Sequence, residues 1–491
     1  MFDPAMPAVT LRRGACALVL CLASLAHGSP ALHTDGALLR DDRGGVVLLR
    51  GVNVAGNSKV PPFRPLGDPA LFDPLQASGL NVVRLLFTWE AYEPMPGQYD
   101  DSYLAYYLAA VRGAAARKLF VIVDFHQDGF SRFTLGGCGE GFPEWTLPPT
   151  VEPLPPDNGA ACKNWGGMML SDPNLGAVWD SFYAGTTTVR AAYLAMIARV
   201  AAALKDERNV IGYDLLNEPG GDEITQASPF YEDAAAAVRT VDATAIIFLS
   251  AGVLTSSGQA SHLPKPSFGN CVFSPHYYDV GVALFHQWNG TDAKPVFDAM
   301  VALSSSWDAP LLLGEYGAPP DTEAGDAYLT SLHALLDGAL ASGTQWVYTP
   351  GWTDELKDGW NREDFSIVDG QGKRRANFRP RLYARRIAGT PTRVTVDEQP
   401  KPALTVEWTH DPAAGETELF IAPDTTLGTH EASLELVGDL TCTHAGDLIS
   451  CTSPTAGPKR VRVTPAHPSC GLTGLEGLLL ISWVLLRRRR R

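Results

Sequence analysis

Two glutamates stand in short motifs that suit acid–base and nucleophilic chemistry. Glu218 lies in the sequence Asn-Glu-Pro at 217–219, and Glu315 lies in Gly-Glu-Tyr-Gly at 314–317. Cleavage of a glycosidic bond needs one carboxylic acid that protonates the leaving oxygen and one carboxylate on the other face of the sugar. The pair therefore predicts glycosidase chemistry. A separation of about 5–5.5 Å between the two carboxyl groups would make the reaction retaining.

Further polar residues stand at or near the ends of the β-rich runs that precede them. They are Arg84, His126, Asp128, Asn217, His276 and Tyr278. Arg84 can supply the positive charge that keeps Glu315 ionised, and the field of that carboxylate helps to keep Glu218 protonated. His126 and His276 lack a third ligand at metal-binding spacing, so the sequence predicts no metal site.

Elements that could hold these residues alternate along the chain. Eight nearly continuous apolar runs predict buried parallel strands: 47–54, 82–89, 119–126, 210–217, 246–250, 271–278, 310–317 and 344–352. Helical patterns at 102–118, 188–205, 230–241 and 326–342 lie between several of them. This alternation predicts an α/β fold, a (β/α)8 TIM barrel, whose strands end at one functional mouth.

The chain beyond the barrel changes character near residue 389. From there to about residue 465, short alternating runs such as 393–396, 404–408 and 434–437 predict a small β-sandwich. We predict a catalytic domain at 29–389 and a sandwich domain at 390–465. The largest insertion, about 129–187, follows the third strand and is expected to shape the substrate cleft.

Both ends of the chain have the pattern of targeting segments. Residues 1–28 combine two arginines, an apolar run and small residues, which predicts a secretory signal peptide. Residues 466–491 contain a cysteine, a short apolar stretch and five arginines, which predicts either a sorting signal of the myxobacterial type or a plain membrane anchor. We therefore expect a secreted or surface-anchored bacterial protein. In such a protein, Cys138–Cys162 and Cys442–Cys451 are expected to form disulfides, and Cys271 is expected to be a buried free thiol.

These motifs resemble glycoside hydrolase family 5, over about residues 35–390. The resemblance implies that Glu218 is the acid/base, that Glu315 is the nucleophile and that Asn217 binds the sugar 2-hydroxyl. It also implies that the family's remaining site residues are Arg84, His126, His276, Tyr278 and, as the aromatic platform on the eighth strand, Trp352.

A closer resemblance, to the endoglycoceramidases, rests on three segments. They are Arg-Gly-Val-Asn at 50–53 through Lys-Val-Pro at 59–61, Asp-Phe-His-Gln-Asp at 124–128, and Gly-Thr-Pro at 389–391 before the β-rich end. It implies hydrolysis of the β-glucosyl bond between glycan and ceramide in glycosphingolipids, with Lys59 and Asp128 contacting the sugar nearest the bond. No cofactor is implied. Contact with a lipid surface is expected through the substrate and the tail.

Two alternatives stay open from the sequence. The same chemistry could serve another family 5 enzyme, namely an endo-β-1,4-glucanase, a mannanase or an exo-β-glucosidase such as a glucosylceramidase. A non-catalytic glycan-binding surface protein would not need both glutamates. The net charge of −15 argues against a nucleic-acid partner, which would require a basic face.

Overall fold

The computed structural model describes residues 31–465, except 158–159, 170, 186–187, 398–401 and 423–431. The predicted signal peptide and the predicted C-terminal tail lie outside the described residues.

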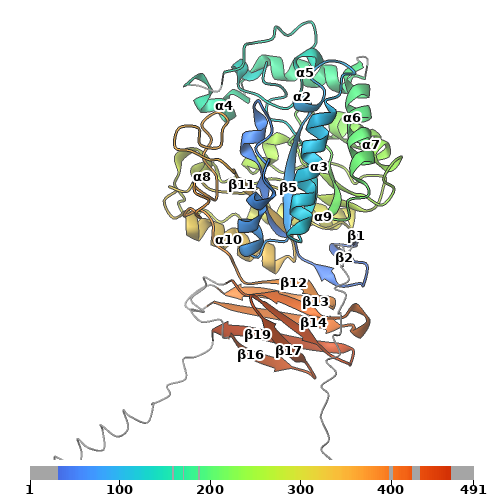
Figure 1. The fold of residues 1–491 in the computed structure, drawn as a ribbon, viewed down its shortest axis with the longest axis vertical. Coiled ribbons are helices and arrows are strands. Elements are labelled where there is room, and N and C mark those ends of the chain that lie inside the picture. The colour runs from blue at the N-terminus through green and yellow to red at the C-terminus, as the bar shows by residue number, and fades with distance from the viewer. Residues whose placement is uncertain are drawn as a thin grey trace, which may run out of the picture.

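Eight parallel strands form the centre of the larger domain (Figure 1). They are β4 (Arg50–Val54), β5 (Val82–Thr88), β6 (Phe120–His126), β7 (Val210–Asp214), β8 (Ile246–Leu249), β9 (Cys271–Phe273), β10 (Leu312–Leu313) and β11 (Ser342–Tyr348). Their order in the sheet is β10-β11-β4-β5-β6-β7-β8-β9, and parallel bridges from Phe273 to Leu311 and from His276 to Glu315 close it into a barrel. The predicted TIM barrel is confirmed.

Helices accompany the barrel strands, and the longer ones bury one face against the barrel. The helices are α1 (Asp73–Ala77), α2 (Trp89–Tyr92), α3 (Asp101–Ala116), α4 (Trp165–Met169), α5 (Pro173–Tyr183), α6 (Thr188–Leu204), α7 (Ser228–Arg239), α8 (Val280–Phe285), α9 (Lys294–Trp307) and α10 (Gly325–Gly338). The Asp100 side chain begins α3 by accepting the N–H groups of Ser102 and Tyr103, which otherwise lack helical partners. Within the described residues, no single helix has the length and apolar character to cross a bilayer, and only the bent pair α5–α6 meets both criteria when combined.

The smaller domain is the predicted β-sandwich, also confirmed. One sheet contains β1 (Leu32–Asp35), β2 (Leu38–Asp41), β3 (Val46–Val47), β12 (Tyr383–Ile387), β15 (Thr417–Phe420), β18 (Leu448–Thr452) and β17 (Thr441–Ala445) in this order. The other contains β13 (Gly389–Asp397), β14 (Ala403–His410), β19 (Gly457–Pro465) and β16 (Ala432–Val437). Trp408 and Val461 lie in the core between them.

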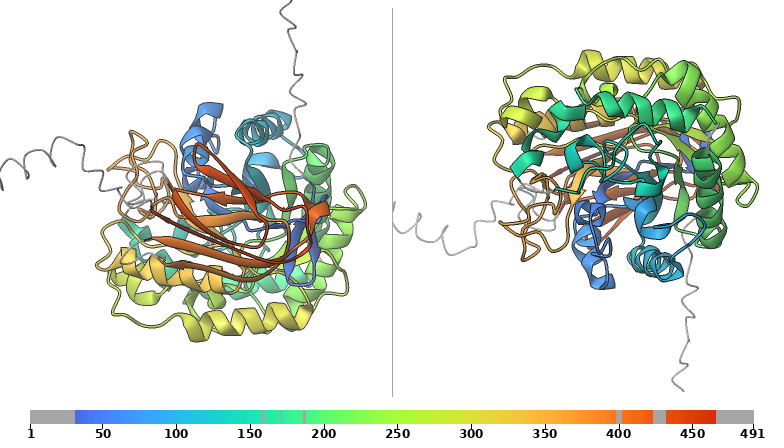
Figure 2. Two further views of the ribbon diagram at one scale, coloured as in Figure 1. Left: turned by 90° about the horizontal axis from the view of Figure 1, so that it is seen from below. Right: turned by 90° about the horizontal axis from the view of Figure 1, so that it is seen from above.

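The sandwich lies under the end of the barrel opposite α4 and α5 (Figure 1). Because α4 and α5 follow the carboxyl end of β6, the sandwich is at the amino ends of the strands, away from the expected active site. Seen from below, the sandwich lies in front of the barrel (Figure 2, left). Seen from above, the segment between β6 and β7 lies in front of it (Figure 2, right).

The sandwich sheet includes strands from the start of the chain. β1, β2 and β3 precede the first barrel strand, yet β3 pairs with β12 and so extends the sheet that also holds β15 and β18. The sheet therefore crosses the predicted boundary at residue 389. A buried bidentate ion pair adds to this connection, since the Arg386 guanidinium donates to both carboxylate oxygens of Asp41 at 2.6 and 3.1 Å.

We expect Asp41→Asn to lower the stability of the protein by weakening the packing of β1, β2 and β3 in the sandwich sheet. Removing one partner leaves Arg386 buried without its counter-charge, which costs about 3–5 kcal/mol for buried pairs. Asp35→Asn is the matched control, because the Asp35 side chain is 60% exposed in its pair with Arg40 and such pairs contribute at most about 1 kcal/mol. Urea unfolding measures the free energy of unfolding of both variants. Equal losses in the two variants would contradict the role of the buried pair.

Candidate active site

The Arg84 guanidinium, on β5, occupies the centre of the barrel mouth and is fully buried. It donates to Glu315 Oε1 at 2.8 Å, to Asp124 Oδ1 at 2.8 Å and to Asp214 Oδ2 at 3.1 Å. It also donates to the side-chain oxygens of Asn53 at 3.0 Å and Asn217 at 2.8 Å. A single buried cation thus connects five acceptors that lie on four strands or on the segments that directly follow them.

Glu315 has a hydrogen-bond donor on each carboxyl oxygen. Arg84 donates to Oε1, and the Tyr278 hydroxyl donates to Oε2 at 2.9 Å. Donors of this kind stabilise the ionised form of a carboxyl group. The contact with Arg84 is the one that the sequence predicted, and it suits a carboxylate that acts as a nucleophile.

Glu218 lies across the mouth from Glu315, four residues beyond the end of β7. Its backbone has a φ of +33°, a strained value for a residue other than glycine that is typical of functional sites. Its Oε1 lies 2.8 Å from His276 Nδ1, and ligand atoms of Glu218, His276 and Glu315 all lie within 4.8 Å of one another. The two carboxyl groups therefore lie at the close spacing of a retaining pair.

Burial raises the pKa of Glu218 to about 8, and the negative charge of Asp128 is the next largest cause. The charge that the sequence predicts for this effect is that of Glu315, but the Glu315 carboxylate is compensated by Arg84. Burial also lowers the pKa of His276 to about 4, so that this imidazole is neutral at pH 7. The site thus contains a protonated acid beside a neutral histidine.

Asn217 is held with its side chain in a defined orientation. Its Oδ1 accepts from Arg84, and its Nδ2 donates to the backbone carbonyl of Gln127 at 3.0 Å. The Gln127 side chain in turn donates to the carbonyls of Asn217 and Glu218 at 2.7 and 3.0 Å. These bonds fix the segment that carries the acid.

A second group of charges flanks the glutamates on the side of β4 and β6. The Lys59 ammonium lies 2.6 Å from Asp128 Oδ2 and over the rings of Trp346 and Trp360, at 4.4 and 4.1 Å from their centres. His126 Nε2 is 3.5 Å from the same Asp128 oxygen. Lys59, Asp128 and His126 are thus brought together as the sequence predicted.

Asp124 determines the charge of His126. Burial lowers the pKa of His126, but the Asp124 carboxylate, 2.6 Å from Nδ1, and the Asp128 carboxylate together outweigh this effect and raise that pKa to about 10. His126 is therefore a cation at neutral pH, in contrast to His276.

Sequence reasoning missed two buried acids beside Lys59. Glu140 is fully buried, and both of its oxygens lack a hydrogen-bond partner among the described residues. Glu363 accepts a hydrogen bond from the Trp346 indole at 3.2 Å. Burial raises the pKa of both carboxyl groups. Both acids follow strands, in the segments after β6 and β11, but no spacing in the chain marks them.

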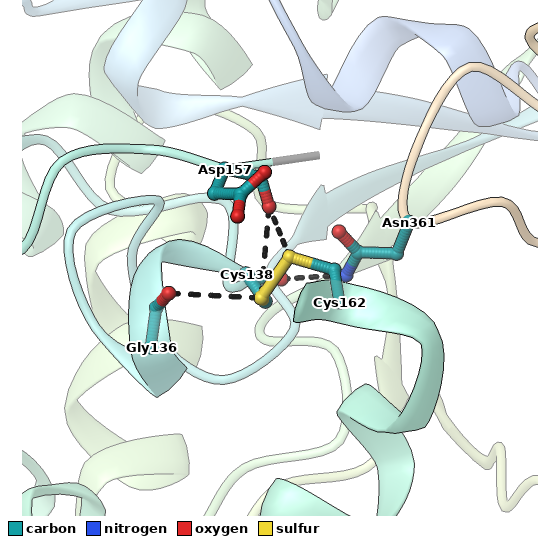
Figure 3. Close-up of a disulfide and its surroundings, with 5 residues drawn as sticks. All are labelled: Gly136, Cys138, Asp157, Cys162 and Asn361. Atoms are coloured by element: carbon teal, nitrogen blue, oxygen red, sulfur yellow. Dashed lines mark hydrogen bonds between the residues drawn. A yellow bond between two sulfur atoms is a disulfide. The ribbon is translucent and has the colours of Figure 1, made fainter. Parts of the chain in front are cut away.

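The segment that carries Glu140 is fastened at several points. The predicted Cys138–Cys162 disulfide is present, as is Cys442–Cys451, and Cys271 is a buried free thiol. The Asn361 side chain donates to the Cys138 carbonyl at 2.7 Å (Figure 3). The backbones of Glu140 and Asp128 also exchange two hydrogen bonds. The long insertion is therefore rigid where it meets the site.

Trp352, the predicted aromatic platform, lies outside this group of contacts. Its ring faces Arg375 at 4.3 Å, and its indole N–H donates to Asp364 at 2.9 Å. Trp346, on β11, is the tryptophan in the site, because its ring stacks on His126 with centres 5.4 Å apart and faces Lys59. The predicted strand 344–352 ran four residues too far, since β11 ends at Tyr348.

The ligand atoms of His126, Asp128 and Glu140 also lie within 4.8 Å of one another, as a metal site would require. The Lys59 ammonium already neutralises Asp128 there. Similarly, the Arg84 guanidinium neutralises Glu315 in the Glu218–His276–Glu315 group. Protein cations therefore supply the positive charge at both positions.

Comparison with known proteins places this barrel in a family. Residues 41–353, more than half of the chain, match the model of "Cellulase (glycosyl hydrolase family 5)". The chain belongs to glycosyl hydrolase family 5.

Two curated relatives match part of this family 5 chain. Endoglycoceramidase I of Rhodococcus hoagii is 33% identical over 191 residues, which are 38% of this chain and 37% of that protein. A glucosylceramidase of Aspergillus fumigatus is 35% identical over 141 residues, 24% of this chain and 18% of its own length. The chain thus spans less than half the length of these relatives.

The fold is shared with endo-glycoceramidase II from Rhodococcus sp. over nearly the whole described structure. Its complex with ganglioside GM3 has a TM-score of 0.74 at 23% identity and covers 88% of this chain and 100% of that one. The same enzyme as a lactosyl-enzyme intermediate has a TM-score of 0.72.

The pKa of Glu218 predicts the basic limit of activity. The protonated acid is present below pH 8, so kcat/KM for a substrate with a poor leaving group falls as the pH rises through about 8. An aryl glycoside with a good leaving group needs less proton donation and shows a shallower fall. Glu218→Gln is the control, and a fall that persists unchanged in this variant would assign the limit to another group.

Two tryptophan variants test the placement of the platform. Trp346→Ala removes the ring that contacts His126 and Lys59, and we expect kcat/KM to fall about 100-fold, as for other losses of positioning. Trp352→Ala, the same change in a ring outside the site, lowers it less than about threefold by the same argument. Kinetics on an aryl β-glucoside measure both, and a larger loss in Trp352→Ala would overturn the assignment.

Proposed function

We propose that this protein hydrolyses the β-glucosyl bond between the glycan and the ceramide of glycosphingolipids by a retaining mechanism. The observation that carries the proposal is the pair of glutamates, whose ligand atoms lie within 4.8 Å of each other and have different hydrogen-bond partners. Glu218 is buried with a raised pKa, and Glu315 receives donors from Arg84 and Tyr278.

In the first step, the Glu315 carboxylate attacks the anomeric carbon of the glucose. The bond between this carbon and the ceramide oxygen breaks, and the Glu218 proton passes to that oxygen, so that ceramide leaves as an alcohol. The products on the enzyme are a glycosyl ester of Glu315 and an ionised Glu218.

In the second step, Glu218 acts as a base. It takes a proton from water while the water oxygen attacks the anomeric carbon, and the ester bond to Glu315 breaks. Arg84 and Tyr278 stabilise the carboxylate that is released, because both donate to it in the free enzyme. The glycan leaves with its original anomeric configuration.

The lipid part of the substrate is supported by the relatives and by the surface. The relatives above are named for ceramide substrates, and the related Rhodococcus structure holds a ganglioside. Large exposed apolar side chains lie on the loops that follow β7, β8 and β9: Ile224, Leu254, Val280, Leu284 and Phe285. Glu218 follows β7 and protonates the leaving oxygen, so these loops lie on the side where ceramide departs.

A second candidate is an exo-glucosidase that removes single glucose residues from glucosylceramide. The A. fumigatus relative, a glucosylceramidase at 35% identity, favours it.

The proposed export and surface attachment of the protein are supported by the patterns at 1–28 and 466–491, and either enzyme would meet its substrate at a lipid surface.

Incubation with lactosylceramide tests the function directly. We expect free lactose and intact ceramide. An exo-glucosidase would leave lactosylceramide uncut, because galactose is its terminal sugar, and would release glucose from glucosylceramide only. Failure to cleave lactosylceramide would therefore contradict the proposal. Glu315→Gln should reduce turnover at least about 10⁴-fold, as expected when a residue essential to the chemical step is removed. Glu218→Gln should slow lactosylceramide far more than an aryl lactoside.

Trapping the intermediate separates the two roles. A 2-fluoro aryl glycoside should add one glycosyl mass to the wild-type protein, located by peptide mass spectrometry at Glu315. The same reagent should label Glu218→Gln, which retains the nucleophile, but not Glu315→Gln. Label on Glu218 would reverse the assignment.

A further inference from the structure

A cavity of about 390 Å³ lies at the end of the barrel that carries the two glutamates. The loops that follow β4, β5 and β6 form its wall. Its wall combines aromatic rings with charged groups, among them Phe63, Glu90, Tyr103, Arg132, Phe133 and Glu144. None of these residues takes part in the catalytic steps above.

Short chain segments connect the cavity to the catalytic centre. Phe63 follows Lys59 by four residues, and Arg132 follows Asp128 by four residues. Lys59 and Asp128 form the ion pair beside the glutamates. Because four residues of chain span at most about 14 Å, the cavity begins within a few sugar lengths of that pair.

A charged pair at the cavity wall can form hydrogen bonds with the hydroxyl groups of a ligand. Arg132 donates to Glu90 Oε2 at 2.8 Å and to Oε1 at 2.5 Å, and each carboxylate oxygen retains a further lone pair. The Glu90 N–H donates to the Gly141 carbonyl at 2.9 Å, which ties this wall to the segment that carries Glu140. The pair is thus held in place on a rigid support.

Aromatic rings lie beside the same guanidinium. The Arg132 guanidinium carbon is 5.8 Å from the ring centre of Phe63 and 5.3 Å from that of Phe133. Both rings are half-buried. A sugar has an apolar C–H face and pairs of neighbouring hydroxyl groups. The aromatic rings can stack on the C–H face, and the Arg132–Glu90 pair can hydrogen-bond the hydroxyls.

We propose that this cavity is a distal glycan subsite, which binds a sugar beyond the second one from the ceramide bond. This inference rests on the proposed function. A ceramide chain does not fit here, because it would desolvate the Arg132–Glu90 pair without offering it hydrogen bonds. The leaving group also departs on the Glu218 side, over the loops after β7, β8 and β9. The subsite makes longer glycans better substrates.

Phe133→Ala tests the subsite by comparing two substrates. We expect kcat/KM for a neutral ceramide tetrasaccharide to fall about tenfold and that for lactosylceramide to change less than twofold. Arg132→Lys keeps the charge but loses the bidentate geometry, and it should lower the same ratio about fivefold. Phe285→Ala on α8 is the matched control, in which the ratio of the two substrates stays as in the wild type.

Equal losses on both substrates, or no loss on either, would overturn the subsite. A loss that depends on acyl-chain length rather than glycan length would assign the cavity to lipid and overturn it too. Calorimetry with free lactose and the free tetrasaccharide needs no ceramide cleavage. Tighter binding of the tetrasaccharide that disappears in Phe133→Ala would support the subsite even if the ceramide assignment failed, and equal affinities in the wild type would refute it.

Discussion

The buried guanidinium of Arg84 is the interaction on which the site depends. Its charge is shared among Glu315, Asp124 and Asp214, three carboxyl groups that come from three different strands. Without a cation at this position, each of these acids would cost several kcal/mol to bury in its ionised form. Burial raises the pKa of Asp214 even with Arg84 beside it, which shows how much negative charge this single cation compensates.

The two catalytic glutamates are both buried, but their neighbours differ. Glu315 contacts a guanidinium and a phenol that both donate, whereas Glu218 contacts a neutral histidine and feels the charge of Asp128. The two acids therefore divide into a proton donor and a nucleophile without any change of residue type. The two histidines divide in the same way, since Asp124 makes His126 a cation while burial keeps His276 neutral.

The mouth of the barrel is asymmetric in a way that fits an amphiphilic substrate. Loops after β4, β5 and β6 carry ion pairs and aromatic rings, and loops after β7, β8 and β9 expose apolar side chains such as Phe285, which is 73% exposed. The sandwich leaves this surface free because it packs at the opposite end (Figure 1). Its sheet includes the first strands of the chain, so the sequence between β3 and β12 forms the barrel as one continuous insertion in that sheet.

The sequence by itself determined the barrel, the sandwich, both disulfides and the two glutamates, because apolar runs and strand-end motifs are local patterns that tertiary contacts only reinforce. It could not locate the end of β11, and so it chose Trp352 where the structure has Trp346. It also missed Glu140, whose neighbours His126 and Asp128 come from the end of β6. The sequence also predicted that Glu218 is the acid, but the cause of its raised pKa was decided by the tertiary structure. That cause is burial and the charge of Asp128, and both arise only after the strands have closed.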